Sequence, residues 1–171
     1  MTKGLQRSLS RGTKATRDSV VERLVVNATL TFTGVDGAAV MATAPLVLLP
    51  KGNIALQGAV ANLTFTGPTS ANLTDDFQGD YSLGTTPADN NTLTGTDVDI
   101  IEATAIVAAS AEASANNRGV NDAQGIIDNT DGTGEVNLNV LLDADEVTDG
   151  EDVVVTVTGS VDVAYIVLGD D

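Results

Sequence analysis

Apolar and polar residues alternate along much of this chain. From Val26 to Gly34 the sequence reads VNATLTFTG, so every second side chain is apolar until the glycine. This period of two is typical of a half-buried β-strand, because successive side chains of a strand point to opposite faces of the sheet. The same alternation returns from Ala59 to Gly67 and from Glu135 to Leu142. We therefore predict β-strands over these three ranges.

Weaker patterns predict further, shorter strands. Proline confines a strand to an edge or an irregular position, so the segment around Pro45 is interpreted as a buried or edge segment. Two strands over 152–159 and 160–168 are expected to form a terminal pair that meets at Gly159. The stretch 102–118 is expected to be mostly loop. The remaining candidates are Ala44–Leu49, Asp80–Thr85, Val98–Ile101 and Thr104–Ala108.

A short signature, Thr-apolar-Thr-Gly, occurs four times, beginning at Thr31, Thr64, Thr92 and Thr156. In a strand its threonines would face outward and its apolar residue inward, and the glycine would permit a turn. The connecting stretches are rich in Gly, Pro, Asn and Asp. Many short strands separated by such loops predict an all-β protein, a β-sandwich or jelly roll, with well under the usual third of helix.

Charge divides the chain into two parts. Six of the eight Lys and Arg residues lie within residues 1–23, against only Asp18 and Glu22, so this segment carries a net +4. The other 148 residues contain two basic and 22 acidic residues, a net −20. We predict an extended basic N-terminal arm over 1–23 and an acidic β-sandwich or jelly-roll body over 24–171. Such an asymmetry indicates that the two parts meet different partners.

Three interpretations of the arm stay open: a solvated tail, an arm that orders on a neighbouring subunit or capsid, and a segment that binds nucleic acid. Glycine, serine and few apolar anchors in the first 18 residues argue against a stable free helix. Ordering on a partner would use the basic side chains together with two leucines. The candidate partner-binding residues are Lys3, Leu5, Arg7, Leu9, Arg11, Lys14, Arg17 and Arg23.

The chain offers little material for catalysis. It contains no histidine and no cysteine, which removes the commonest general base, the strongest nucleophile and the preferred zinc ligands. Paired carboxylates such as Asp75-Asp76, or Asp97 with Asp99, lack the aromatic residues that usually line a sugar-binding cleft. We predict that the protein is not an enzyme, and we expect no catalytic residue and no cofactor.

Calcium is the alternative use of the acidic residues. The stretch 143–150 places several carboxylates close together, but Val147 stands where an EF-hand-like loop needs an oxygen donor. We interpret this stretch as a solvated acidic loop and expect no metal site.

Membranes and nucleic acid are not expected partners of the body. No run of 18 apolar residues is present, and no apolar stretch follows the basic N-terminus as it would in a secretory signal. An acidic body repels nucleic acid and anionic lipid. The motifs and aromatic platforms of sequence-specific and single-strand binders are also missing.

Three short blocks carry a resemblance to a known family: Phe77–Thr85 (FQGDYSLGT), Thr92–Ile101 (TLTGTDVDII) and Ala164–Asp171 (AYIVLGDD). In these blocks the chain resembles small virion structural proteins of tailed bacteriophages, above all capsid decoration, or cement, proteins. The similarity extends over roughly residues 77–171. It lies in these short blocks of sequence and in their general character, and not in a single diagnostic motif.

This resemblance implies a β-sandwich or jelly-roll body on the outer surface of a capsid, where it would stabilise the shell. It implies the major capsid protein as partner, a homo-oligomer (trimer or dimer) at a symmetry axis, and an extended terminus that grips the shell. It carries over no catalytic residue. Two alternatives remain: a phage tail, head-completion or fibre-base protein, and a secreted surface adhesin module.

Overall fold

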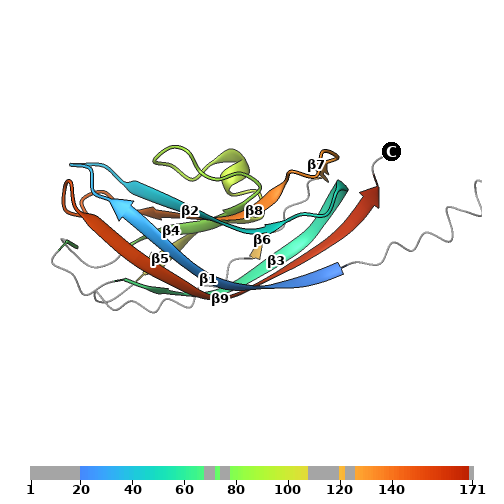
Figure 1. The fold of residues 1–171 in the computed structure, drawn as a ribbon, viewed down its shortest axis with the longest axis horizontal. Coiled ribbons are helices and arrows are strands. Elements are labelled where there is room, and N and C mark those ends of the chain that lie inside the picture. Colours follow the sequence, from blue (N-terminus) through green and yellow to red (C-terminus); the bar gives the residue numbers. More distant parts are fainter. Residues whose placement is uncertain (1–19, 68–71, 74–77, 108–119, 122–125, 170–171) are drawn as a thin grey trace, which may run out of the picture.

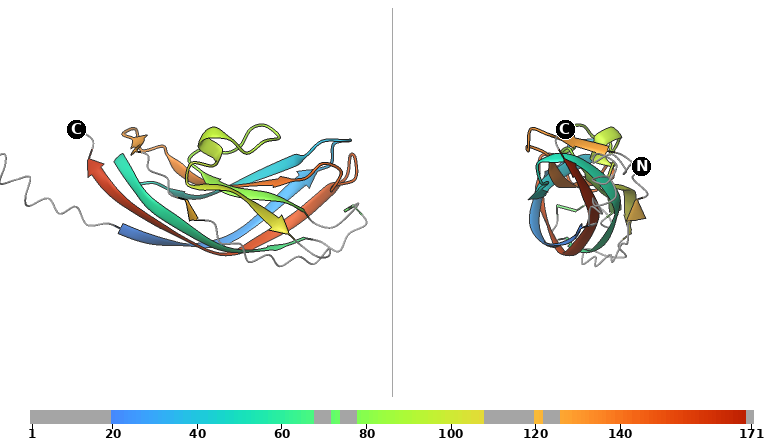
Figure 2. Two further views of the ribbon diagram at one scale, coloured as in Figure 1. Left: turned by 180° about the vertical axis from the view of Figure 1, so that it is seen from behind. Right: turned by 90° about the vertical axis from the view of Figure 1, so that its right-hand side faces the viewer.

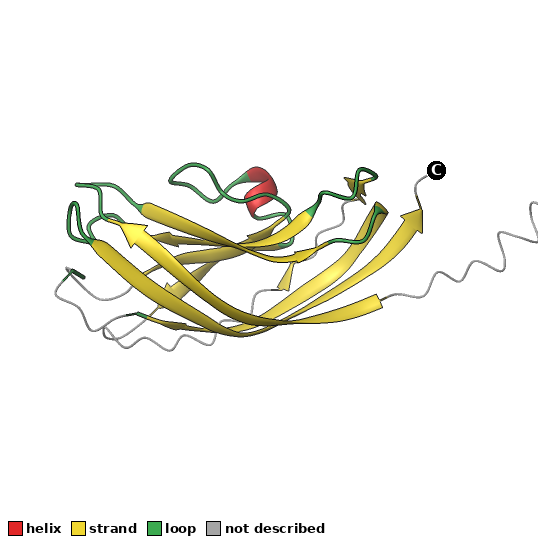
Figure 3. Cartoon of the chain, viewed as in Figure 1, coloured by secondary structure: helices red, strands yellow, loops and turns green. Residues whose placement is uncertain are grey.

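The computed structural model describes residues 20–67, 72–73, 78–107, 120–121 and 126–169. Apart from one turn of 3-10 helix, η1 (Gly95–Asp97), the regular structure in these ranges is entirely β (Figure 3). No helix in the described ranges is long and apolar enough to cross a membrane. The strands are β1 (Val20–Thr33), β2 (Val40–Leu48), β3 (Gly52–Thr66), β4 (Gln78–Gly84), β5 (Ile101–Val107), β6 (Val120–Asn121), β7 (Ile126–Asn129), β8 (Glu135–Leu142) and β9 (Asp152–Gly169).

The strands form two antiparallel sheets that pack face to face (Figure 1). The first sheet has the order β1-β9-β3, and both β6 and β7 pair with the far edge of β3. The second sheet has the order β2-β8-β4-β5. The long strands β1, β3 and β9 run the length of the molecule and curve around the shorter second sheet (Figure 2).

The pairing follows one nested scheme. β1 pairs with β9, β2 with β8, β3 with β7, and β4 with β5, so the chain is one long antiparallel hairpin rolled up on itself. Successive pairs lie alternately in the first and second sheet. This arrangement is the jelly roll. The predicted all-β sandwich or jelly roll is confirmed.

The core lies between the two sheets. Along β1, Leu24, Val26, Leu30 and Phe32 are buried while the residues between them are exposed or partly exposed. The alternation in the sequence arises from this half-burial. Where the sheets meet, the Phe65 ring of β3 packs against the Tyr81 ring of β4, with ring centroids 5.3 Å apart.

The strongest predicted strands are confirmed. β1 begins at Val20 and covers the predicted strand as far as Thr33, and β8 has the predicted bounds. β3 begins at Gly52, seven residues before the predicted start. β2 is an edge strand, and the register against β8 shifts just after Pro45, as expected for a proline without a backbone N–H.

The predicted pair of C-terminal strands is wrong. β9 is one strand of 18 residues, and Gly159 lies within it, opposite Val26 of β1 and Leu63 of β3. The glycine serves close approach and not a turn. Its φ is 137°, and a Cβ atom there would lie 2.1 Å from the Asn62 carbonyl oxygen. Sequence alone cannot separate these two uses of glycine.

The loop predicted over 102–118 is also wrong in its first part, where the strand predicted over Thr104–Ala108 is confirmed as far as Val107. Residues 101–107 form β5, which pairs with β4. The alanines and the glutamate would also suit a helix, but β4 supplies the partner strand that decides the conformation. Residues 108–119 lie outside the described residues.

Candidate interaction surface

The predicted arm joins the body at the beginning of β1. Residues 20–23, assigned to the arm from sequence, are paired with β9 in a register that runs without interruption from Val20 opposite Tyr165 to Thr33 opposite Asp152. The other seven candidate partner-binding residues lie outside the described residues, so their role stays a prediction. They are Lys3, Leu5, Arg7, Leu9, Arg11, Lys14 and Arg17.

Arg23 is the one candidate that the structure describes, and it forms an ion pair within the chain. Its Nε donates to Asp162 Oδ1 and its Nη2 to Oδ2, both at 2.7 Å. This two-point hydrogen bond lowers the pKa of Asp162 and raises that of Arg23. The Arg23 side chain is 70% exposed and that of Asp162 31%, so the pair faces solvent. Such a pair contributes little to stability.

Beneath this pair, a second contact joins the same two strands. The Tyr165 hydroxyl of β9 donates to Glu22 Oε2 of β1 at 3.1 Å. Burial, and then the hydrogen bond and charge of Glu22, raise the pKa of Tyr165. The beginning of β1 is therefore joined to β9 by side chains as well as by the backbone hydrogen bonds of the sheet.

Exposed valines surround the Arg23–Asp162 pair. Val21 and Val25 flank Arg23 on β1 and are 67% and 83% exposed, and Val60 of β3 lies opposite Asp162 in the ladder and is 37% exposed. We call these five residues the Arg23 patch. Sequence reasoning missed it, although the run Val20–Val26 gave a signal: its apolar residues occupy both phases of the strand.

Beyond the patch, the outer face of the first sheet carries rows of neutral polar side chains. Thr29, Thr156 and Thr66 lie opposite one another across three strands, and the next row contains Asn27, Thr158 and Thr64. In three copies of the Thr-apolar-Thr-Gly signature the apolar residue is buried: Phe32, Phe65 and Val157 are 0% exposed. The threonines on either side of it therefore face outward, as the sequence predicted. On the outward positions of β1, β9 and β3, the charged residues are Arg23, Asp162 and Asp152.

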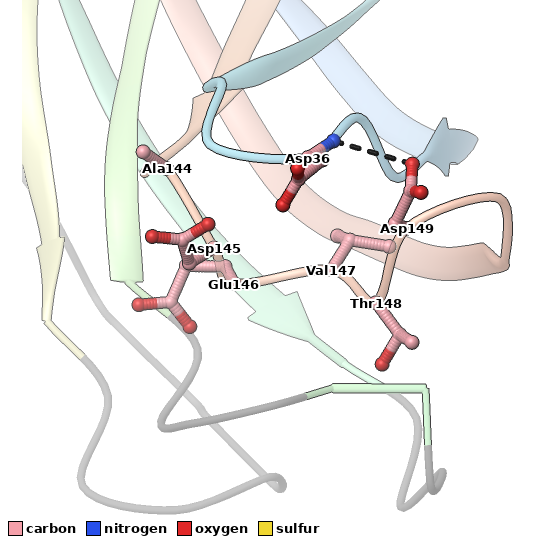
Figure 4. Close-up of a pocket in the computed structure, with 7 residues that line it drawn as sticks. All are labelled: Asp36, Ala144, Asp145, Glu146, Val147, Thr148 and Asp149. Atoms are coloured by element: carbon pink, nitrogen blue, oxygen red, sulfur yellow. Dashed lines mark hydrogen bonds between the residues drawn. The ribbon is translucent and has the colours of Figure 1, made fainter.

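An acidic pocket lies at the opposite end of the strands, between the turn after β1 and the β8–β9 loop (Figure 4). It has a volume of about 350 Å³ and is lined by Asp36, Asp145, Glu146 and Asp149, together with Ala144, Val147 and Thr148. Two carboxylates connect the loops, because the backbone N–H groups of Asp36 and Gly37 donate to Asp149 and Asp145, each at 3.2 Å. Among the described residues, no group of three or more carboxylates is placed to hold a metal ion.

Calcium should therefore leave the stability of the protein almost unchanged. We expect thermal melts in EDTA and in 1 mM calcium to coincide within about 1–2 °C, because a site with a Kd near 10 μM would contribute about 2.7 kcal/mol at that concentration. In a domain of this size that contribution would raise the Tm by roughly 5–10 °C. A rise of this size, absent in magnesium and lost in Asp145→Asn, would contradict the prediction.

A second pocket, of about 310 Å³, lies where the segment after β4 approaches β3 and β7. Asp99 lines it and accepts two hydrogen bonds from Thr85, from the backbone N–H at 2.8 Å and from Oγ1 at 2.6 Å. Burial raises the pKa of Asp99, and the Thr85 bonds oppose that rise. Asp99 thus holds the segment between β4 and β5 in place. In the sequence this residue forms a pair of neighbouring carboxylates with Asp97, and in the structure its role is structural.

Comparison with known proteins gives no family. No family model matches the chain, and no curated protein matches it. Among solved structures, a chain of the cyanophage Pam1 capsid asymmetric unit is similar at 20% identity and a TM-score of 0.42, over 88% of this chain and 85% of that one. A chain of infectious bursal disease virus, Gx strain, is similar at 14% identity and a TM-score of 0.38. That match covers 89% of this chain, which spans about a third (33%) of the viral one. Both TM-scores are below 0.5.

Proposed function

We propose that this chain is a structural protein of a virion: a capsid decoration protein that binds the outer surface of a capsid through its N-terminal arm and stabilises the shell. The observation that carries the proposal is the division of charge, +4 over residues 1–23 against −20 over the rest. The jelly-roll body and the resemblance of three sequence blocks to phage decoration proteins support it. The major capsid protein is the proposed partner.

The entropy lost when the arm becomes ordered on the capsid determines which contacts it needs. Fixing some 18 residues costs about 1–2 kcal/mol each in backbone entropy. Exposed ion pairs return only about 0–1 kcal/mol each. The arm therefore needs backbone hydrogen bonds and burial of Leu5 and Leu9 in the capsid surface, with its basic side chains on acidic groups or carbonyls. Its binding should weaken with salt without collapsing.

Deleting residues 2–18 should abolish binding to the shell. The test is co-sedimentation with particles of the virus that encodes the chain, assembled without it, across a series of salt concentrations. Two full-length variants separate the contributions. Replacing Leu5 and Leu9 by Ser should weaken binding at every salt concentration by more than about tenfold, which corresponds to about 1.4 kcal/mol. Replacing Lys3, Arg7, Arg11, Lys14 and Arg17 by Gln should remove most of the salt dependence.

Two results would contradict the proposal. If the deleted chain, shown by circular dichroism to keep its β structure, binds particles as tightly as the full chain, then the arm is not the anchor. If the full chain instead binds naked DNA with a steep salt dependence, its arm belongs inside a particle. Immunogold labelling of intact virions, which reaches only exposed protein, would distinguish a location on the head surface from one on the tail.

A further inference from the structure

The Arg23 patch combines two features of a protein interface. It places three exposed valines, Val21, Val25 and Val60, around an arginine whose guanidinium is already paired with Asp162 through two hydrogen bonds. Interfaces are depleted in most charged residues at their centre but enriched in arginine. Exposed apolar side chains that gather beside one another, and not singly, mark interaction sites.

Low charge on this face would let two acidic bodies approach each other. Residues 24–171 carry a net −20, so most approaches of one copy to another bring carboxylates together. The outward positions of β1, β9 and β3 carry only Arg23, Asp152 and Asp162, a net −1. Neutral threonine and asparagine rows continue this low-charge face beyond the patch.

The face is also large enough. β1 has 14 residues, all paired with β9. At about 3.3 Å per residue and 4.8 Å between strands, three strands of this length cover about 45 by 14 Å, or roughly 600 Å². This is the area of the whole outer face and equals the lower limit of the 600–1,000 Å² that each partner contributes to a stable interface, so the contact must include the polar rows as well as the Arg23 patch.

We propose that the outer face of β1, β9 and β3, with the Arg23 patch at one end, is the contact between two copies of this chain, related by a two-fold axis. In such an interface the same surface of each copy meets itself, so it must be self-complementary. The patch meets this condition: it holds one positive and one negative group, and each guanidinium can bridge its own and the partner copy's carboxylate while the valines of both copies become buried. This inference does not depend on the proposed function, because the pair can form in solution without a capsid.

Sedimentation equilibrium of the full chain tests the proposal. We expect a monomer–dimer equilibrium over about 1–200 μM, and Val25→Asp should raise the dimer Kd at least tenfold, since it places an unpaired carboxylate in the contact. The control is Ile126→Asp on β7, which changes a residue that is 66% exposed at the other edge of the sheet and should leave the Kd unchanged. A chain that stays monomeric throughout, or a dimer equally tight in V25D, would overturn the proposal.

Charge exchange tests whether Arg23 and Asp162 meet across the contact. R23D leaves two negative charges in the patch and D162R two positive ones, so each variant alone should be mainly monomeric. An equimolar mixture should form heterodimers, because the opposite charges then face each other between the copies. A control mixture of R23D with wild-type protein should associate less than the R23D and D162R mixture. If the mixture of R23D and D162R associates no better than either variant alone, the proposed contact is wrong.

Discussion

Phe65→Ala is expected to remove about 3–5 kcal/mol from the free energy of unfolding, a large part of the 5–15 kcal/mol of a typical domain. Phe65 is 0% exposed and lies where both sheets meet, against the Tyr81 ring. Truncation loses the transfer free energy of the ring and leaves a cavity between two layers that are each held by backbone ladders. Those ladders keep the sheets from closing over the space.

Urea denaturation followed by circular dichroism measures this loss. With a denaturant slope near 2 kcal/mol per molar, the midpoint should fall by roughly 2 M. Thr66→Ala, an exposed neighbour on the same strand, should change stability by less than about 0.5 kcal/mol. A loss below about 1 kcal/mol for Phe65→Ala would mean that Phe65 is not in the core between the sheets.

The strands that sequence predicted best are those in which apolar and polar residues alternate. From Val26 onward in β1 the alternation arises because one face meets the other sheet, whereas in β8 the polar residues between the apolar ones are buried as well. In both strands the period identifies the strand without knowledge of its partners. β5 has no such simple signal, and its conformation depends on pairing with β4. Local patterns therefore predicted the jelly-roll strands, whereas the nested pairing is a property of the whole chain.

Glycine was the main source of error. Gly34 follows β1, close to the Thr148 carbonyl, and Gly159 lies in the middle of β9, although both end the same four-residue signature. Both glycines lie against a backbone carbonyl, but the same four-residue signature ends a strand in one place and lies inside a strand in the other. The neighbouring strand decides between them, and that neighbour is distant in sequence.

The candidate site was predictable only in part. Arg23 was selected because it is basic and near the N-terminus, but its partner Asp162 lies 139 residues away. Val60 of β3 joins the patch only through the ladder with β9. A charge imbalance can be read from a sequence. The residues that surround Arg23 in the folded protein can be identified only from the register of the strands.

Asn139 shows how a polar residue of a half-buried strand can be fully buried. It lies on the outer side of β8, where alternation predicts exposure, yet it is 0% exposed because the segment between β4 and β5 covers it. Its Oδ1 accepts from the Ala88 N–H at 2.9 Å. Its Nδ2 donates to the carbonyls of Thr86 at 3.1 Å and Asp97 at 3.0 Å. One side chain thus fastens this segment to the second sheet.

Asn139→Ala should therefore cost about 2–5 kcal/mol, because each buried group left without a partner costs about 1–3 kcal/mol. Asn139→Asp should cost at least as much at pH 7. Its carboxylate would keep the Ala88 bond but face two carbonyl oxygens as a buried charge. Acidification should restore part of this loss, because the protonated carboxyl can donate once more. Asn91→Asp, on an exposed loop residue, is the control and should change stability by less than about 0.5 kcal/mol. Urea midpoints at pH 7 and pH 5 measure all three variants, and an Asn139→Asp protein as stable as the wild type would show that the segment is not held by this side chain.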